Sequence, residues 1–401
     1  MDTTEMIDNQ ATTMETKPYE VIAYNDFESM NLPETLLRSL YAYGFEKPSA
    51  IQAVGIVPMT QGHDVIAQAQ SGTGKTGTFC TGAISNIDTS YKGVQVIVFA
   101  PVRELAQQIE YVAKHLCEHN KVKVYSATGG TPVREDIQAI RNGAQFIVGT
   151  PGRLFDLLNR ENLIDRNHIR YLVFDEADQL LSDKFRDQCM EILKLGFPPS
   201  VRVALFSATM PDSVREFSDN LLQNPVRILL PPEQVTLDGI KQYSVEIERE
   251  EWKFDVLCDI YAQLNITQAI IYCNRRQRAE WLAQKMKEAG FSLECIHGDM
   301  EVRERKRRMD DFRKGGVRVL ISTDMLARGI DIQQISLVIN FELPQQKENY
   351  IHRIGRSGRY GKKGVSINLI DKNTESSVQR DICDFYRTTI QELPNDLARL
   401  L

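Results

Sequence analysis

Short apolar runs alternate with amphipathic segments along most of this chain. The apolar runs have strand length, and intervening segments such as 103–119 and 133–142 have the spacing of amphipathic helices. Runs that are apolar on both faces are typical of parallel strands covered by helices, so the pattern predicts an α/β fold with parallel sheets. The predicted strands are 64–67, 94–100, 122–126, 145–149, 171–174, 201–206, 268–273, 293–296, 317–322, 337–341 and 365–370.

The alternation stops at Leu230-Pro231-Pro232-Glu233 and then restarts. Proline pairs end regular structure and stiffen linkers. The first 22 residues are polar and unpatterned, which is typical of a flexible tail. We therefore expect a tail at 1–22, a first domain at 23–229, a linker at 230–240 and a second α/β domain at 241–401.

Length and composition fit this division. A chain of 401 residues can form two domains, each with its own core, and its composition is that of a soluble globular protein. The longest apolar runs are too short for a transmembrane helix, and the seven cysteines include no Cys-x-x-Cys pair that would indicate a zinc ribbon. The net charge of −6 does not indicate a bulk basic surface. We expect any nucleic acid to be held by local arginines, backbone amides and helix N-termini.

A candidate phosphate-binding loop follows the predicted strand at 64–67. Its sequence, 69–76, contains Gly72 and Gly74, which let loop amides turn toward a phosphate, and a predicted helix begins at Lys75. In this pattern the lysine reaches the β- and γ-phosphates and the Thr76 hydroxyl binds Mg²⁺. Ala69 stands where the general P-loop pattern has glycine. We predict a nucleoside triphosphate site; the alternative is a glycine-rich turn before a core helix.

A carboxylate follows the predicted strand at 171–174. Asp175 is followed by Glu176, Ala177 and Asp178. An aspartate at the carboxyl end of a strand, beside a P-loop, suits Mg²⁺ coordination through water, and the glutamate after it can act as general base toward an attacking water. Taken alone, these four residues would also suit an acidic helix start.

Two distant segments offer further groups to a nucleotide. Phe45 can stack on adenine and Gln52 offers a donor and an acceptor to its edge, although a buried Phe beside a helix start would look the same. Near the end of the chain, Arg353, Arg356 and Arg359 recur at spacings of three. Guanidinium groups supply charge to phosphoryl-transfer transition states. If both ends act on one nucleotide, the chain must close on it as a clamp.

The order of these motifs resembles that of DEAD-box ATP-dependent RNA helicases, from about Phe27 to Leu401. The likeness rests on the segment around Gln52, on 69–76, on Asp175–Asp178, on Ser207-Ala208-Thr209 and on 352–359. Segments 250–255 and 326–331 are most similar to the initiation-factor-four-A group of that family. The resemblance implies two RecA-like, doubly wound parallel-sheet domains joined by a short linker. It also implies an RNA-stimulated ATPase that uses ATP and Mg²⁺ and locally unwinds short RNA duplexes.

The resemblance assigns roles to matching residues. Together with Phe45, the implied nucleotide-binding residues are Lys47, Gln52, Ser71, Gly72, Thr73, Gly74, Lys75, Thr76, Gly77, Asp331, Arg356, Arg359 and Tyr360. The implied metal-binding residues are Thr76 and Asp175, and the implied catalytic residues are Lys75, Asp175, Glu176, Arg356 and Arg359. The implied coupling residues are Asp178, Ser207, Thr209 and His352. The implied RNA contacts are Pro101, Arg103, Gly129, Gly130, Thr150, Gly152, Arg153, Asn274, Gly298, Asp299 and Thr323.

Two positions depart from the family pattern. Val102 stands where the family usually has threonine, and Val302 stands where it usually has glutamine. Loss of a hydroxyl removes one hydrogen bond to phosphate, worth about 1 kcal/mol net. We therefore expect intact ATP chemistry and one or two weakened RNA contacts, for which the basic run 303–308 can compensate.

The resemblance implies a cytoplasmic monomer that acts in translation initiation, on single-stranded and short duplex RNA without sequence preference. It further implies two partners, a HEAT-repeat initiation scaffold and an accessory RNA-binding factor, and no membrane. The alternatives are an exon-junction or ribosome-biogenesis helicase of the same core, an ATP-gated RNA clamp that does not turn over, and a P-loop ATPase that acts on DNA.

Overall fold

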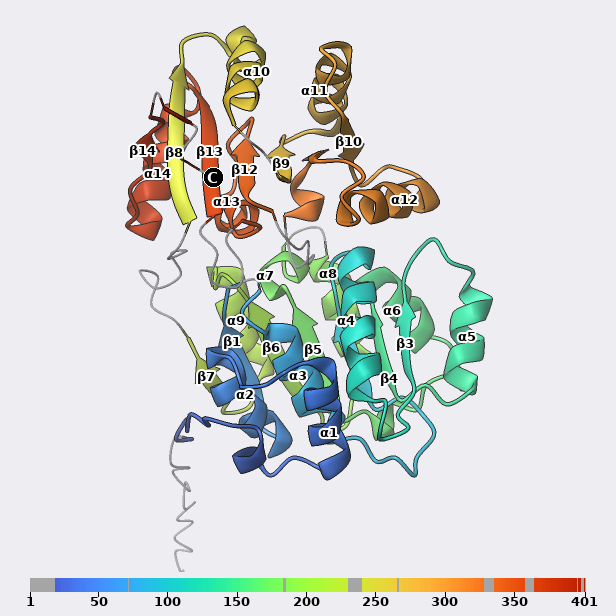
Figure 1. Ribbon diagram of the computed structural model, residues 1–401. Coiled ribbons are helices and arrows are strands. Elements are labelled where there is room, and N and C mark those ends of the chain that lie inside the picture. Colours follow the sequence, from blue (N-terminus) through green and yellow to red (C-terminus); the bar gives the residue numbers. More distant parts are fainter. Residues whose placement is uncertain are drawn as a thin grey trace, which may run out of the picture.

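Two seven-stranded, all-parallel sheets form the frame of this computed structural model, one in each half of the chain. It describes residues 19–70, 72–182, 185–229, 240–264, 267–327, 335–357, 364–394, 396–397 and 400. Figure 1 shows the second half of the chain stacked on the first, with the strands of the first half pointing toward the second. The predicted α/β class, with two doubly wound parallel-sheet domains, is confirmed.

The first sheet has the order β3-β4-β2-β5-β6-β1-β7 and the second the order β10-β11-β9-β12-β13-β8-β14. The strands of the first sheet are β1 Val65–Gln68, β2 Val96–Phe99, β3 Val124–Ala127, β4 Phe146–Gly149, β5 Tyr171–Asp175, β6 Arg202–Ser207 and β7 Val226–Ile228. Those of the second are β8 Ile240–Ile247, β9 Ala269–Tyr272, β10 Leu293–Ile296, β11 Val319–Ser322, β12 Leu337–Asn340, β13 Gly364–Asp371 and β14 Gln391–Glu392.

Helices connect the parallel strands. In the first half they are α1 Glu34–Tyr43, α2 Ala50–Thr60, α3 Lys75–Ile84, α4 Arg103–Leu116, α5 Val133–Arg141, α6 Pro151–Leu158, α7 Ala177–Leu180, α8 Arg186–Lys194 and α9 Asp212–Leu221. In the second they are α10 Lys253–Gln263, α11 Arg276–Glu288, α12 Val302–Arg313, α13 Lys347–Ile354 and α14 Ser376–Tyr386. Short 3₁₀ turns lie at Glu28–Met30, Arg166–His168, Glu250–Trp252 and Asp324–Leu326.

Alternate side chains of each central strand enter two different cores. In β2, for example, Val96 and Val98 pack with α1–α4 on one face, whereas Ile97 and Phe99 pack with α6–α9 on the other. The second sheet is covered in the same way, with α10 and α11 over one face and α12–α14 over the other. Both faces of a parallel strand are therefore buried, which explains why its sequence reads as a continuous apolar run.

Three strands were missed in the sequence. The edge strands β7 and β14 have three and two residues, too short for a pattern. Strand β8 alternates polar and apolar residues, and its first residue, Ile240, was assigned to the linker. The rest of that predicted linker, 230–239, lies outside the described residues, as do residues 1–18. Within the predicted tail, Tyr19 donates a hydrogen bond to Gln61 Oε1 (2.9 Å). The other predicted domain boundaries stay predictions.

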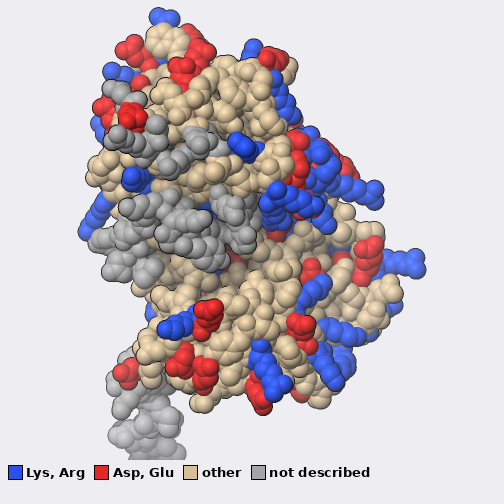
Figure 2. Space-filling model, in the orientation of Figure 1, with Lys and Arg blue, Asp and Glu red and all other residues tan. Residues whose placement is uncertain are grey.

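Charges of both signs are interspersed over the face shown in Figure 2, and Lys and Arg gather at the edge where α12 lies. Several of these α12 cations are neutralised locally. Arg307 and Arg308 both bind Glu304 at 2.8 Å. The surface thus agrees with the expectation from the net charge that positive potential is local rather than general.

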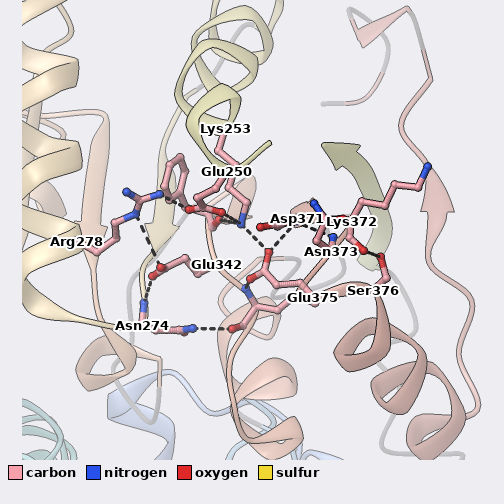
Figure 3. Close-up of polar contacts among 12 residues, drawn as sticks. Glu250, Lys253, Asn274, Arg278, Glu342, Asp371, Lys372, Asn373, Glu375 and Ser376 are labelled. Carbon is pink, nitrogen blue, oxygen red and sulfur yellow. Dashed lines mark hydrogen bonds and ion pairs between the residues drawn. The ribbon is translucent and has the colours of Figure 1, made fainter. Parts of the chain in front are cut away.

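A buried lysine joins several elements at one end of the second sheet (Figure 3). Lys253, at the start of α10, has no exposed side-chain surface and donates hydrogen bonds to Glu375 Oε2 (2.6 Å) and the Phe341 carbonyl (3.0 Å). Its Nζ also lies 3.3 Å from Glu250. Glu375 in turn accepts hydrogen bonds from the amides of Leu343 and Asp371. The ion pair therefore fixes the loop after β12 against α10 and the end of β13.

We expect Lys253→Met to lower the free energy of unfolding of the second domain by about 3–5 kcal/mol, because it leaves Glu375 buried without its cation. Both tryptophans of the chain, Trp252 and Trp281, lie in this domain, so their fluorescence in urea reports its unfolding separately. The control is Lys285→Met, at a lysine with 49% of its side chain exposed, which should change stability by less than about 0.5 kcal/mol. Equal midpoints for the two variants would contradict a structural role for the pair.

Candidate active site between the two domains

Most of the predicted functional residues follow the carboxyl ends of parallel strands; Phe45, Lys47 and Gln52 lie between α1 and α2 or on α2, and His352 and Arg356 lie on or just after α13. In the first sheet, the loops after β1, β5 and β6 carry the other predicted nucleotide and coupling residues, and the loops after β2, β3 and β4 carry the predicted RNA contacts. In the second sheet, the loops after β9, β10 and β11 carry the remaining RNA contacts. The sheet order therefore places the two sets side by side along one edge, where ligands of open α/β sheets bind.

The phosphate-binding loop lies between β1 and α3, as predicted. Gly74 has a φ of +106°, and a β-carbon there would lie 2.6 Å from Ser49 Oγ. A β-carbon at Gly77 would lie 2.6 Å from Gln52 Nε2 and 3.0 Å from Phe45 Cζ. Both glycines are thus required by close approach to the segment that was predicted to bind adenine. Lys47 is exposed, and Ser71 lies outside the described residues.

Gln52 has a structural task that the sequence did not reveal. Its Oε1 accepts a hydrogen bond from the Ser49 amide (2.9 Å), while Ser49 Oγ accepts one from the Gln52 amide, which forms a capping box at the start of α2. The side chain is 2% exposed, and its amide nitrogen faces the P-loop glycines. Gln52 therefore links the helix start to the phosphate loop, and contact with adenine stays a prediction.

Lys75, Asp175 and Glu176 meet in a buried position. Lys75 Nζ lies 3.3 Å from Glu176 Oε1, and the side chains are 6% and 1% exposed. Burial raises the pKa of Asp175 well above its usual range; the charge of Lys75 opposes the shift and that of Glu176 adds to it. Glu176 has a positive φ of 53°. A non-glycine residue in this region is strained, and such strain is concentrated at functional sites.

Asp178 connects both domains. Its Oδ2 accepts hydrogen bonds from the Thr209 hydroxyl (2.7 Å) and from His352 Nε2 (2.8 Å), and its amide donates to Ser207 Oγ (3.4 Å). His352 Nδ1 lies 3.7 Å from Glu176. The structure thus brings all four predicted coupling residues together, with His352 from the second domain and the others from the first. We call the buried face where the domains meet the seam.

The arginines of 352–359 have different surroundings. Arg356 is 1% exposed, and its Nε donates to the His352 carbonyl (3.2 Å). Arg353 is bound wholly within the second domain, to Asp324 (2.5 Å), the Glu342 carbonyl (2.7 Å) and Asn274 Oδ1 (2.7 Å). The expectation that all three arginines offer charge to a nucleotide is therefore wrong for Arg353, which orders the domain interior. Arg359, Tyr360 and Asp331 lie outside the described residues.

The RNA contacts predicted in the first domain form a continuous group. Arg103 donates to the Gly129 carbonyl, and Arg153 pairs with the buried Asp136 and donates to the Thr131 carbonyl (2.8 Å). The buried Nε and Nη1 of Arg103 have no hydrogen-bond partner among the described residues. Burial lowers the pKa of this guanidinium, and the charge of Arg305 lowers it further. An anionic ligand would relieve both effects.

The other predicted contacts are placed less uniformly. Pro101 is buried, Thr150 and Thr323 are half-buried, and Gly152 and Gly298 are exposed. Asp299 is exposed and pairs with Arg276 (2.7 Å). The side chain of Asn274 is used inside its domain: Nδ2 donates to the Leu343 carbonyl (2.8 Å) and Oδ1 accepts from Arg353. An RNA contact by this residue would therefore need its backbone or a rearrangement.

A second bond across the seam had no signal in the sequence. Arg305 Nε lies 2.6 Å from Glu104 Oε1, and the side chains are 10% and 12% exposed. In the sequence, Arg305 stands out only as part of the basic run 303–308. An ion pair between residues 201 positions apart (305 − 104) follows from the fold alone, because α4 and α12 both begin at the seam.

Two family models match the chain. Residues 49–217 match the family described as DEAD/DEAH box helicase, and residues 252–361 match the helicase conserved C-terminal domain. The chain belongs to the DEAD-box helicase family. The resemblance inferred from the motifs is thereby confirmed, and the RecA-like architecture with it.

Relatives of this DEAD-box protein match over nearly its whole length. Eukaryotic initiation factor 4A-9 from Nicotiana tabacum is 51% identical over 94% of this chain and 91% of its own. ATP-dependent RNA helicase fal1 from Schizosaccharomyces pombe is 49% identical over 95% and 96%. Among solved structures, S. cerevisiae Dbp5 bound to RNA and ADP BeF3 has a TM-score of 0.86 at 34% identity, over 93% of this chain and 96% of that one.

The buried site fits a nucleotide with a divalent cation. Three carboxylates, Asp175, Glu176 and Asp178, are at most 6% exposed, and burial raises the pKa of Asp175, a shift that a bound cation would oppose. Glu176, Asp178 and His352 each place a ligand atom within 4.8 Å of the others, but their mutual contacts already account for that grouping. Among the described residues, no helix is both long and apolar enough to span a membrane.

Because the pKa of Asp175 is raised, the folded protein holds this proton more tightly than the unfolded chain, and stability is lost as the pH rises through the folded pKa. We expect nucleotide-free Asp175→Asn to be more stable than wild type at pH 8, by about 1–3 kcal/mol, and the difference to shrink toward about pH 5. Urea unfolding followed by circular dichroism measures it. The exposed Asp187→Asn is the control. A stability difference that does not change with pH would contradict the raised pKa of Asp175.

Proposed function

We propose that this protein is an ATP-dependent RNA helicase that couples ATP hydrolysis to closure of its two domains on RNA. The observation that carries the proposal is the bond between Asp178 and His352, which exists only when the domains meet. Ala177 alone separates Asp178 from Glu176, the candidate general base. Family membership and the named helicase relatives support the same activity.

The chain's own residues have separable tasks in hydrolysis. Lys75 and the P-loop amides bind phosphate oxygens, and Thr76 and Asp175 would hold Mg²⁺, which neutralises charge developing on the phosphates when bound. Glu176 accepts a proton from the attacking water. Arg356 brings positive charge from the second domain. Only 1% of its surface is exposed, so little solvent reaches the guanidinium when the domains are closed. Arg359, Asp331 and Tyr360 are proposed to complete the nucleotide site from the same domain.

RNA is proposed to lie along the loops after β2, β3, β4, β9, β10 and β11. Support comes from Arg103, whose buried Nε and Nη1 lack partners among the described residues, and from exposed glycine backbone at Gly130, Gly152 and Gly298. Contacts of this kind reach sugar and phosphate, so sequence preference should be weak. Since ATP and RNA both bridge the seam, each favours closure and strengthens binding of the other.

The biological setting proposed is translation initiation, in the cytoplasm, on messenger RNA leaders. Relatives named initiation factor 4A favour it. A HEAT-repeat scaffold and an accessory RNA-binding factor are proposed as partners of a protein that is otherwise monomeric. The second candidate is a role like that of fal1, whose 49% identity to this chain is nearly as high as the 51% of initiation factor 4A-9. Pulldown of an initiation scaffold or of splicing factors separates the two.

Glu176→Gln tests the proposed catalytic base. It removes the proton acceptor but keeps the size of the side chain, so ATP turnover should fall by about 10²–10⁴-fold while ATP-dependent RNA binding persists. Phosphate release and RNA binding by fluorescence anisotropy are measured on the same preparation. The exposed Glu191→Gln is the control. Hydrolysis by Glu176→Gln at the normal rate would exclude this residue as the base.

Arg103→Met tests the RNA path. Because charge-assisted bonds to phosphate contribute about 1.5–3 kcal/mol, the RNA concentration for half-maximal ATPase stimulation should rise about 10-fold or more. KM for ATP without RNA should stay within about twofold, since Arg103 lies away from the P-loop along the sheet edge. Arg141→Met, on the exposed end of α5, should leave RNA stimulation unchanged. An unchanged RNA requirement in Arg103→Met would place RNA elsewhere.

A further inference from the structure

The two residues that depart from the family pattern, Val102 and Val302, both lie at the seam. Val102 is the residue before α4, and Val302 is the first residue of α12. Each is half-buried. We propose that these valines form an apolar contact between the domains that drives part of the closure without RNA. The inference rests on the proposed ATP- and RNA-dependent closure.

Val102 packs in two cores at once. It lies against the main core of the first domain, which α1–α4 build, and also against an apolar cluster of the second domain that includes Met309, Phe312 and Leu326. Among the described hydrophobic residues of the first domain, it alone packs against that cluster. Its side chain therefore loses contact with water on the second-domain side only when the domains close.

Val302, in the second domain, contacts the first domain at Gly130. A β-carbon built at Gly130 would lie 3.0 Å from Val302 Cγ2 and would collide with Arg103 Nη2. Gly130 has a φ of +81°, a conformation that favours glycine, and its lack of a side chain leaves room for Val302. A methyl group of the second domain thus rests on bare backbone of the first, at a position where an RNA contact was predicted.

An ion pair between the domains lies next to the two valines. Glu104, two residues after Val102, binds Arg305, three residues after Val302, at 2.6 Å. Both side chains are largely buried, and the Arg305 Nη1 also donates to the Gly298 carbonyl (3.2 Å). The seam at this point therefore combines half-buried apolar groups with an ion pair that is largely shielded from water.

Compared with threonine at 102 and glutamine at 302, the valines should weaken the binding of RNA and favour closure of the domains. A threonine at 102 and a glutamine at 302 would offer hydrogen bonds to phosphate, but in the absence of RNA they would have to bury those polar groups on closure. Valines offer nothing to phosphate and gain from burial whether or not RNA is present. This chain should consequently close with nucleotide alone more readily, and depend less on RNA, than the same chain with the polar residues.

The test compares wild type with Val102→Thr, Val302→Gln and the double variant. Val102→Thr keeps the shape and changes only one methyl to a hydroxyl. Fluorescence energy transfer between labels at the exposed positions Glu118 and Glu288 measures closure with Mg²⁺, ADP and beryllium fluoride, without RNA. The closed-to-open ratio should fall about threefold to fivefold in each single variant and further in the double variant. RNA-free ATPase should fall in parallel, while kcat at saturating RNA stays within about twofold.

The matched control is Val256→Thr. This valine is half-buried on α10 and packs only within the second domain, so closure should not change. Closure in Val102→Thr and Val302→Gln equal to wild type would overturn the inference, as would an equal loss in Val256→Thr. The energy-transfer comparison needs no RNA and no turnover. If no variant, wild type included, responds to RNA, the proposed function fails, and the closure data still decide the role of the valines.

Discussion

Buried charge at the seam is the constraint on which the rest of this structure depends. Asp178 and His352 form a bond between domains with almost no exposure, and Lys75 and Glu176 form a buried ion pair within the first domain beside it. Removing such groups from water is costly unless geometry and partners are complete. For His352 and Asp178 the partner comes from the other domain, so an open arrangement would rehydrate both. Under the proposed function, closure and the assembly of the hydrolytic site are therefore one event.

The predicted strands show how much of the fold can be predicted from the sequence. Each central strand, such as β2 or β9, is apolar on both faces because helices cover both, and all eleven that were predicted form. Those that were missed are two very short edge strands and β8, in which Lys241, Gln242 and Glu246 interrupt the apolar run. The linker boundary inferred from Pro231-Pro232 fell one residue inside β8.

The site was predictable as a set of loops but not as a set of contacts. Motif order identifies which residues follow a strand, and the parallel sheet then places them along one edge. The spacing of the motifs does not show which side chains form hydrogen bonds within their own domain. Arg353 and Asn274 bind each other inside the second domain, and Gln52 caps α2. Lys253 is a further example. It lies in segment 250–255, which is similar to the initiation-factor-four-A group, and its burial gives a structural reason for a lysine at this position.

The geometry of the seam also explains how a chain with a net charge of −6 can hold RNA. Helices α3, α4, α6, α11 and α12 all begin within a few residues of a strand end, so their N-termini point to the shared edge. Each supplies a partial positive charge. Positive helix ends on both domains repel one another across the seam, and anionic phosphate between them would remove that repulsion. Glu104, in the first turn of α4, offsets part of that repulsion by binding Arg305 at the first turn of α12. An apolar contact at the same place adds attraction that needs no phosphate, and this is why the valines matter at that position and would not elsewhere.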